Sequence, residues 1–476
     1  MSTLLYPPSI DWEITSGCNH NCIHCYNYWR TQTNDHSIGN TSFYEKIANK
    51  IIQSKPVSVQ ITGGEPLIKW SSITGAIRNL IEAGINVSIN TNAALVTDDI
   101  ARFLAENNVD AFVSIPCSRP EIFDRVVNCK GASKRVFSGI DLFVKHGVRI
   151  SLNMVVTKIN YPYIYETACF VKERFGVTYF SATKASFPQN ADADFKNQIL
   201  NLKEFNEMLE TLLRIKHETG MRVDSAWVYS SCGFSNLELL NSFGFNRKCG
   251  CGRYTFVIDS NGNIKACGCD DRTYGNILEN SFSDSIAKMV AWQNASMLPP
   301  ECIKCSFMKY CGGGCRMDGK GNHGIDNSVD STANPAHKAL LKKNSSTEKL
   351  SKDTFISLNP SATFVKEKCG YRISYKTNYE YVSDTFYTFI CTNQCFILSS
   401  ILNYNETINN DIIADIKKLV HKKLLKITAG KVTNDNKTTN LSQNIYPLIV
   451  SPYIDFDSSD LIKDYASSEI IFKRFV

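Results

Sequence analysis

The chain has 476 residues, of which 43% are apolar and 21% are charged, and this ordinary globular composition excludes disorder as the main state. Lys and Arg number 52 against 46 Asp and Glu, and a net charge of +6 without a long basic block argues against a nucleic-acid-binding protein. Asp11 and Glu13 interrupt any signal-peptide pattern, and no apolar run reaches about eighteen residues, so we expect a soluble, cytoplasmic protein without a membrane partner.

Residues 9 to about 220 alternate between short β-branched runs and stretches with helical spacing. Helical spacing is clearest in TSFYEKIANKII (41–52) and in ITGAIRNLIEAG (73–84), which closes on a glycine as helix C-termini often do. Six such repeats predict an α/β fold with a parallel sheet, either an open doubly wound sheet or a partial (β/α)6, TIM-like barrel. The predicted strands are SIDWEITSG (9–17), VSVQITGG (57–64), NVSINTN (86–92), DAFVSIP (110–116), RISLNMVVT (149–157) and VTYFSAT (177–183).

Chemically interesting residues follow the ends of these strands. A three-cysteine loop follows the first strand, GGEP (63–66) follows the second, Asn92 ends the third and Ser114 ends the fourth. Both candidate architectures place the active site at the carboxyl ends of the strands. We therefore expect these residues to meet on one face of the sheet.

Composition divides the chain into four parts, of which residues 1–220 form the expected barrel. Residues 221–320 lose the periodicity and are rich in Cys and Gly, which predicts a small cysteine-rich domain held by metal. Residues 321–360 are rich in Ser, Asn and Lys and are expected to be a linker. Residues 361–476 are expected to form an α+β module, with a hairpin or meander at 374–390 and two helices after it.

Eighteen cysteines in a chain without an export signal indicate metal or redox chemistry more than disulfides. The first group, CNHNCIHC, is Cys18-x3-Cys22-x2-Cys25. A zinc site would need a fourth ligand, for which His20 and His24 are available. Three thiolates on a four-iron cluster would instead leave one iron free to bind a chelating substrate.

This loop resembles the signature of the radical S-adenosylmethionine (SAM) enzymes, Cys-x3-Cys-x-aromatic-Cys, with His24 at the aromatic position and Tyr26 after the last cysteine. The resemblance implies a [4Fe–4S] cluster on the three cysteines, whose remaining iron binds SAM. It also implies reductive cleavage of SAM to methionine and a 5′-deoxyadenosyl radical, which abstracts hydrogen from the substrate. The electron would come from a low-potential donor such as flavodoxin or ferredoxin.

GGEP resembles the motif of the same family that receives the SAM amino group. By itself it would be a turn with a helix-starting proline. Behind the cysteine loop, Gly63 and Gly64 let backbone carbonyls approach an ammonium group, and Glu65 adds a negative charge. These residues and Pro66 are therefore candidate SAM contacts.

Three further residues resemble SAM contacts of the family. Asn92, in NTNAAL (90–95), would lie near the SAM ribose, although Ala93 stands where the family usually has glycine. Ser114 and Arg135 resemble the pair that holds the SAM carboxylate. Each also has an ordinary explanation, as a strand-end hydroxyl and as a solvated helix residue.

The second cysteine group reads Gly262-x4-Cys267 and then Cys302-x2-Cys305-x5-Cys311-x3-Cys315. A zinc ribbon is the simplest explanation, but eight thiols between 249 and 315 exceed the need of one zinc. After a radical SAM core, the spacing resembles the SPASM extension of peptide-maturing enzymes, which carries two auxiliary [4Fe–4S] clusters. The resemblance assigns Cys249 or Cys251, Cys267 and Cys315 to the first cluster, and Cys302, Cys305 and Cys311 to the second.

The chain departs from this pattern because the final cysteine of the second cluster is absent. NPAH (334–337) resembles the turn that ends in that cysteine and makes His337 the candidate ligand, since imidazole replaces thiolate on some clusters. The alternatives are His323, Cys369, an open iron or a lost cluster. Cys269 is unplaced and could replace Cys249 or Cys251 in the first cluster.

The reaction class depends on the fate of the substrate radical. Several oxidative relatives carry an aspartate directly after the Gly-x4-Cys cysteine, whereas here Gly268 takes that place and Asp270 is the candidate base. Epimerases return a hydrogen atom from a cysteine, for which Cys117 is the candidate. Free cysteine is nevertheless more often a small buried core residue.

Together these residues predict a radical SAM peptide maturase that forms a thioether or C–C crosslink in a ribosomally made precursor peptide. The C-terminal module faintly resembles winged-helix domains that bind leader peptides by strand addition, and a dimerisation or capping domain is an equal alternative. Peptide epimerisation, sulfatase maturation and small-metabolite modification are alternative activities. A non-catalytic iron–sulfur or zinc scaffold or electron carrier is the alternative of another class.

Overall fold

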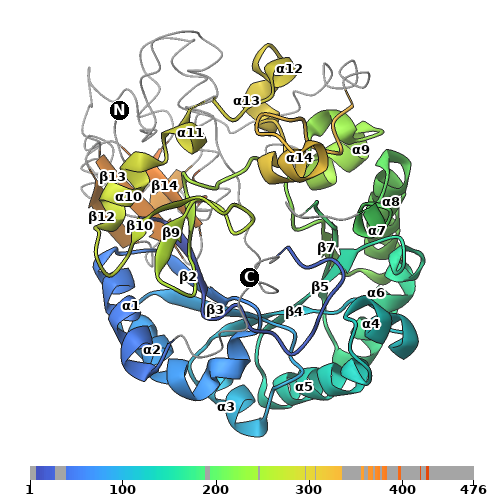
Figure 1. Ribbon diagram of the computed structural model, residues 1–476, viewed down its shortest axis with the longest axis horizontal. Helices are drawn as coiled ribbons and strands as arrows, with labels where there is room; N and C mark the ends of the chain where they lie inside the picture. The colour runs from blue at the N-terminus through green and yellow to red at the C-terminus, as the bar shows by residue number, and fades with distance from the viewer. Residues whose placement is uncertain are drawn as a thin grey trace.

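A ten-stranded sheet forms the centre of the molecule (Figure 1). The computed structural model describes residues 7–26, 39–187, 193–244, 247–294, 296–305 and 307–334, and beyond these only the short strands given below and residue 419. The sheet order is β10-β9-β8-β1-β2-β3-β4-β5-β6-β7, and all neighbours from β8 to β7 are parallel. The first seven strands are β1 (Ser9–Glu13), β2 (Ser58–Thr62), β3 (Asn86–Thr91), β4 (Asp110–Ser114), β5 (Ile150–Val156), β6 (Tyr179–Lys184) and β7 (Arg222–Asp224).

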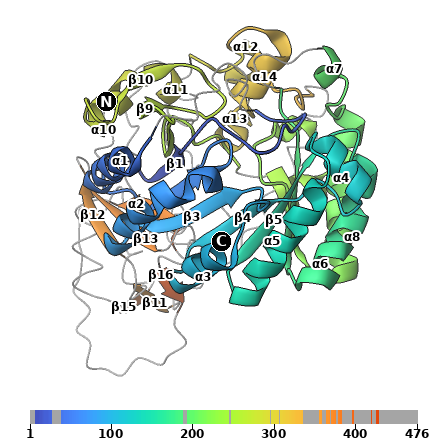
Figure 2. The same cartoon turned by 60° about the horizontal axis from the view of Figure 1, so that its bottom comes forward.

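Helices form an arc around the outer face of this curved sheet (Figures 1 and 2). The α/β alternation and the partial barrel expected from the six strand–helix repeats are confirmed. Helix starts follow local capping chemistry, since the Asn40 side chain accepts from Phe43 N at 3.0 Å at the start of α1. The helices are α1 (Thr41–Gln53), α2 (Trp70–Glu82), α3 (Asp98–Glu106), α4 (Pro120–Val126), α5 (Ala132–His146), α6 (Ile164–Phe175), α7 (Ala193–Lys196) and α8 (Leu202–Thr219).

The apolar core lies between the sheet and this helical layer. Strand β1 combines apolar and polar residues, most of which are buried. Ile10 and Trp12 are fully buried, and Glu13 at the carboxyl end is 2% exposed. Ile61 of β2 and Ile89 of β3 continue the same buried cluster. A strand that is covered on both faces leaves only its ends for polar chemistry.

The cysteine-rich region continues the sheet and does not begin a separate one. Strand β8 runs parallel to β1 with Ser9 opposite Thr255, and β9 and β10 follow antiparallel. Strands of three or four residues are too short for a clear periodicity, which is why the sequence indicated only loss of pattern after residue 220. The elements of this region are α9 (Leu237–Leu239), β8 (Thr255–Ile258), β9 (Asn263–Lys265), β10 (Thr273–Asn276), α10 (Phe282–Lys288), α11 (Val290–Gln293), α12 (Pro300–Ile303), α13 (Met308–Cys311) and α14 (Arg316–His323).

The first part of the expected linker, residues 321–334, is packed into the protein. Helix α14 extends to His323, and Asp330 and Thr332 are 2% and 1% exposed. The linker prediction is wrong here because these polar side chains bond buried backbone groups, which composition does not reveal. Residues 335–354 lie outside the described part of the chain.

Beyond residue 354 the described strands form two three-stranded sheets. The expected meander exists but lies earlier, as β12-β13-β14. In the second sheet β15 and β16 flank β11, so the two helices predicted over these residues are wrong at 395–397 and 425–427, where pairing with β11 decides the structure. The strands are β11 (Phe355–Leu358), β12 (Thr363–Glu367), β13 (Gly370–Tyr375), β14 (Asn378–Val382), β15 (Cys395–Ile397) and β16 (Leu425–Ile427).

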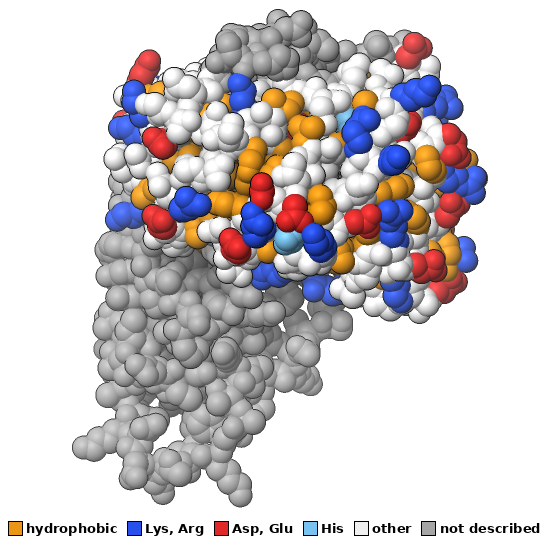
Figure 3. Space-filling model, turned by 90° about the horizontal axis from the view of Figure 1, so that it is seen from below, with side chains coloured by type: hydrophobic (Ala, Val, Ile, Leu, Met, Phe, Trp, Pro, Cys, Tyr) orange, Lys and Arg blue, Asp and Glu red, His pale blue; other side chains and the backbone are white. Residues whose placement is uncertain are grey.

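The distribution of charged side chains on the surface agrees with the mild net charge of the chain (Figure 3). Acidic and basic side chains are interspersed on the face seen in Figure 3, with apolar side chains between them. Among the helices that the structure describes, none is long and apolar enough to cross a membrane.

Candidate active site

The first cysteine loop follows β1 and lies against the end of α4. Backbone hydrogen bonds hold the middle residues of this loop. One of them, from Cys25 N to Cys22 O at 3.2 Å, closes a turn between two of the cysteines. The Cys18 sulfur accepts a hydrogen bond from His20 N at 3.4 Å. The bonds to the end of α4 run from Asn21 N to Val127 O and from Ile23 N to Val126 O, both at 3.0 Å.

The GGEP turn after β2 is bonded directly to the segment before this loop. Gly64 N donates to Thr15 O at 2.6 Å, and Glu65 N donates to Gly17 O at 2.8 Å. A Cβ atom on Gly64 would lie 2.0 Å from Gly17 O, so the close approach requires glycine. The two motifs are therefore one structural unit at the carboxyl ends of β1 and β2.

The Glu65 carboxylate organises this end of the sheet. Its Oε1 accepts from Thr91 Oγ1 at 2.7 Å and from Leu67 N at 3.1 Å, and its Oε2 accepts from Asn92 N at 2.8 Å. Burial raises the pKa of Glu65 to about 7, although these three hydrogen bonds oppose the shift. The side chain is 1% exposed.

Asn92 connects the end of β3 to the cysteine loop. Its Nδ2 donates to Asn19 Oδ1 at 2.7 Å and lies 3.9 Å from Cys18 Sγ. Ala93, where the family usually has glycine, adopts a φ of 60°, a backbone region that glycine enters freely. The structure thus places Asn92 beside Cys18, and its assignment to the SAM ribose stays a prediction.

Ser114 and Arg135 belong to different elements, β4 and α5. Ser114 ends β4 opposite Asn153 of β5. Arg135 lies on α5, where its Nη2 is 3.1 Å from Cys129 Sγ, and that sulfur is 3.8 Å from the backbone oxygen of Asn19. Their assignment as a pair that holds the SAM carboxylate stays a prediction.

His20, one of the two histidines that could complete a zinc site, is 4% exposed. Burial, together with the neighbouring Arg135, lowers its pKa to about 4. The imidazole is therefore neutral at pH 7.

The second cysteine group contains a row of thiols. The Cys251 thiol bonds those of Cys249 and Cys267, and the Cys269 thiol bonds that of Cys267. These bonds hold the pKa of Cys267 well below its usual range, and the contact with Cys251 lowers the pKa of Cys249 to about 7. Burial raises the pKa of Cys315, and Cys249 and Cys267 are near enough to raise it further. These five thiols fit an auxiliary cluster site, with one more thiol than four irons need.

The two cysteine groups meet at Gly268. A Cβ atom there would lie 3.5 Å from both Tyr26 Cε2 and Glu13 Oε1, so the residue after Cys25 and the end of β1 both border the Cys267–Cys269 loop. Burial raises the pKa of Glu13 to about 8, Lys265 opposes the shift, and Cys267 adds to it. Glu13 was not among the functional candidates predicted from the sequence. The feature that could have indicated it is a carboxylate at the end of a strand whose other residues are mostly buried.

Asp270 and Cys117, the two catalytic candidates, occupy different environments. Asp270 is fully buried and its Oδ2 accepts from Arg272 Nε at 2.8 Å, while burial raises its pKa. Cys117 is also fully buried, and its sulfur lies 4.0 Å from Thr167 Oγ1 of the outer helix α6. Burial raises the pKa of the Cys117 thiol. The core position agrees with the packing alternative, and both catalytic assignments stay predictions.

Cys302, Cys305 and Cys311 share one cavity with Cys232, which the sequence reasoning treated as scattered. Burial raises the pKa of Cys232 to about 11 and that of Cys302 to about 12, and the neighbouring thiols add to both shifts. Cys232 lies so far before the motif in the sequence that the cysteine spacing does not indicate that they meet. His337, the predicted ligand, lies outside the described residues.

Residues 12–171, which contain the cysteine loop, GGEP and Asn92, match the Radical SAM superfamily. These residues form a radical SAM domain. Its cofactors are SAM and a [4Fe–4S] cluster, for which Cys18, Cys22 and Cys25 are the ligands that fit. The cysteine-rich region after the barrel fits an auxiliary cluster domain.

Two relatives extend the similarity beyond the matched domain. An AdoMet-dependent heme synthase of Methanosarcina barkeri is 24% identical over 337 residues, which cover 65% of this chain and 91% of the relative. The mycofactocin maturase MftC of Mycolicibacterium smegmatis is 25% identical over 325 residues, which cover 65% of this chain and 78% of the relative. Both alignments are long enough to include the cysteine-rich region.

Two solved structures have the same fold as this radical SAM enzyme. The structure of anSMEcpe with bound AdoMet and Cp18Cys peptide superimposes with a TM-score of 0.54 at 18% identity, and covers 68% of this chain and 93% of that one. Streptococcus suis SuiB bound to the precursor peptide SuiA superimposes with a TM-score of 0.54 at 19% identity, and covers 69% of this chain and 76% of that one.

Proposed function

We propose that this radical SAM enzyme is a peptide maturase that forms a thioether or C–C crosslink in a ribosomally synthesised precursor peptide. When bound, the clusters and SAM supply an electron donor, a 5′-deoxyadenosyl radical and an electron acceptor close to the substrate. A crosslink removes two hydrogens from the peptide, so the site also needs a proton acceptor.

The contact between the two cysteine groups at Gly268 carries this proposal. Tyr26 belongs to the loop that holds the SAM cluster ligands, and Gly268 lies between Cys267 and Cys269 of the thiol row. An oxidative reaction requires the site of radical formation and the electron acceptor to be near each other, whereas an epimerisation has no such requirement. MftC and the peptide complexes of anSMEcpe and SuiB add support for a peptide substrate.

Two buried carboxyl groups border the Cys267–Cys269 loop, and they differ as proton acceptors. Asp270 is paired with Arg272 at 2.8 Å, which stabilises its ionised form and fixes its position. Glu13 has a pKa raised to about 8, so its ionised form, a minor fraction near neutral pH, accepts a proton more readily than an ordinary carboxylate does. We infer that Glu13 is the better candidate for the proton acceptor, and that Asp270 positions Arg272.

The relation to an AdoMet-dependent heme synthase favours a second candidate, oxidation of a small molecule. A small substrate would use the same pair of cysteine groups. It would not need the chain beyond residue 354.

The experiment is an anaerobic assay of the reconstituted enzyme with SAM, a strong reductant and short candidate peptides encoded beside its gene, read by mass spectrometry. A crosslink removes two hydrogens from the peptide mass and is accompanied by 5′-deoxyadenosine. An epimerase would leave the mass unchanged in H2O and would add deuterium in D2O. Formation of 5′-deoxyadenosine without change in any peptide would favour the small-molecule candidate.

A further inference from the structure

Four cysteine side chains from two distant parts of the chain line one cavity. Cys302, Cys305 and Cys311 come from the segment around α12 and α13, and Cys232 comes from the turn before α9. The cavity has about 450 Å³ of empty space, part of which is open to solvent. None of these four cysteines forms a disulfide.

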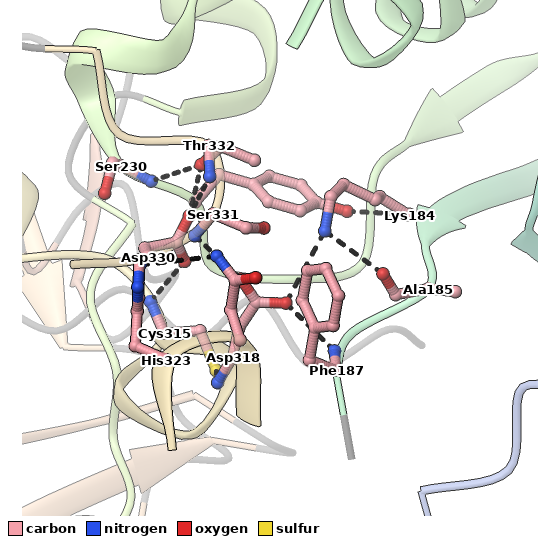
Figure 4. Close-up of polar contacts among 12 residues, drawn as sticks. Lys184, Ala185, Phe187, Ser230, Cys315, Asp318, His323, Asp330, Ser331 and Thr332 are labelled. Carbon is pink, nitrogen blue, oxygen red and sulfur yellow. Dashed lines mark hydrogen bonds and ion pairs between the residues drawn. The ribbon is translucent and has the colours of Figure 1, made fainter. Parts of the chain in front are cut away.

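A buried polar network brings the Cys232 turn to this place (Figure 4). Asp330 Oδ2 accepts from Cys315 N at 2.8 Å, and Asp330 Oδ1 accepts from Thr332 N at 2.8 Å. Thr332 Oγ1 in turn accepts from Ser230 N at 3.2 Å. The segment 330–334 therefore ties the turn that contains Cys232 to the start of α14, where the cysteine motif ends.

The approach is close enough to require a glycine beside Cys232. A Cβ atom on Gly233 would lie 2.2 Å from the backbone oxygen of Thr332. Lys184 supports the same segment from β6, since its Nζ is 3.5 Å from Asp318 Oδ1 and Asp318 Oδ2 accepts from Ser331 N at 2.9 Å. Fixed turns of this kind hold a side chain in place more firmly than an exposed loop does.

Backbone N–H groups point at the sulfur atoms of this cavity. Ser231 N donates to Cys311 Sγ at 3.2 Å, and Asn334 N donates to Cys232 Sγ at 3.3 Å. Hydrogen bonds to cysteine sulfur are a regular feature of iron–sulfur sites, where they tune the cluster. The same kind of bond occurs at Cys18, Cys267 and Cys315, with donors His20 N, Cys269 N and Asp318 N, each at 3.4 Å.

We propose that Cys232 is the fourth protein ligand of a second auxiliary [4Fe–4S] cluster, together with Cys302, Cys305 and Cys311. The cysteine missing downstream of the motif is thus replaced by one upstream of it. The second cluster is neither lost nor left with an open iron, and it does not need the imidazole of His337. The inference concerns the metal site alone and does not depend on which substrate the enzyme modifies.

The arrangement suits a cluster better than a zinc ion. Zinc holds four thiolates at about 2.3 Å from one centre, which draws the sulfur atoms into a compact tetrahedron. Within the described ranges, which include the four thiols of this cavity, no three His, Cys, Asp or Glu side chains are arranged to hold a single ion. In a four-iron cluster each thiolate binds a different iron, so the four sulfur atoms lie farther apart.

The experiment compares iron, sulfide and zinc in wild-type enzyme and in the Cys232→Ala variant after identical anaerobic reconstitution. Three clusters correspond to about twelve irons, so Cys232→Ala should lose about one third of the iron and sulfide. Cys169→Ala is the matched control, because Cys169 lies on α6 and does not line the cavity, and it should retain all of the iron. His337→Ala should retain it as well.

Folding is monitored separately, because Cys232→Ala could also loosen the turn. Formation of 5′-deoxyadenosine from SAM should persist in this variant, which separates a local loss from failure of the radical SAM site. Cys232→Ser keeps the size of the side chain and offers oxygen as a ligand, and it should change the electron paramagnetic resonance spectrum of the reduced enzyme.

Three results would overturn the proposal. The first is an unchanged iron content in Cys232→Ala together with an unchanged spectrum in Cys232→Ser. The second is loss of iron in His337→Ala with none in Cys232→Ala, which would return the fourth ligand to the histidine. The third is loss of zinc in place of iron and sulfide.

Discussion

The backbone N–H of Asn92 donates to Glu65 Oε2 at 2.8 Å, and this bond fixes the end of β3 to the GGEP turn. The Asn92 side chain continues the connection to Asn19 in the cysteine loop at 2.7 Å. Three segments that are distant in sequence are thereby held as one unit at the carboxyl ends of β1, β2 and β3. Disturbing the Glu65 carboxylate should therefore affect both cofactor binding and stability.

Glu65→Gln should destabilise the enzyme by about 1–3 kcal/mol and weaken SAM binding. Both carboxylate oxygens of Glu65 accept hydrogen bonds, so an amide NH2 in place of either one would face a buried donor. The measurements are the melting temperature under anaerobic conditions and SAM affinity by calorimetry. Glu82→Gln, at the exposed end of α2, is the control, and equal behaviour of the two variants would contradict the role of Glu65.

Cys22→Ala should abolish 5′-deoxyadenosine formation and leave the auxiliary iron bound. We predict that the three cysteines of the first loop hold one of three clusters, whereas the auxiliary thiols come from other parts of the chain, so about one third of the iron should be lost. Iron and sulfide quantification measures the loss, and chromatography measures the nucleoside. Nucleoside formation at the wild-type rate would exclude Cys22 as a ligand.

The raised pKa of Glu13 predicts that the free energy of unfolding depends on pH. Its pKa is raised from 4.5 to about 8 in the folded protein, so the folded state holds a proton that the unfolded state has lost between these values. The stabilising contribution is therefore complete below about pH 4.5 and disappears as the pH rises through 8, with a total on the order of a few kcal/mol.

Glu13→Gln removes this titration and tests it. The melting temperature of the wild type should fall more steeply than that of the variant between pH 5 and about pH 8.5, because only the wild type must ionise Glu13. The difference between the two proteins is the quantity to measure, since Glu65 titrates in the same direction in both. Parallel curves would mean that Glu13 is ionised throughout this range.

Lys184→Met should destabilise the enzyme by about 3 kcal/mol or more. Lys184 and Asp318 are each 3% exposed, so removal of the lysine leaves a buried carboxylate without its cation. Lys145→Met is the control, because Lys145 and its partner Asp98 are largely exposed and solvent screens their pair. A melting temperature of Lys184→Met equal to that of the control would show that the buried pair contributes little.

Much of the first domain could be predicted from sequence because its signals are local. The alternation of β-branched runs with helical spacing gave the strands and helices of the barrel, and parallel topology then placed Asn92 and GGEP at one edge. The segment 321–334 could not be predicted in this way, because its Ser, Asp and Thr residues look solvated until their buried partners are known. For the same reason the sequence did not show which four of the five thiols at the first auxiliary site would bind a cluster.

By itself the sequence determined the chemistry of the first loop, because three thiolates within eight positions and a GGEP turn behind a strand carry their function in their spacing. Only the tertiary structure decided which distant groups meet. It brought Glu13 and Tyr26 to Gly268, and it brought Cys232 to Cys311 through hydrogen bonds of Ser231 and Thr332. The physical reason is that spacing records only contacts within a short stretch of chain, whereas a metal site or a buried carboxyl group is defined by what surrounds it in space.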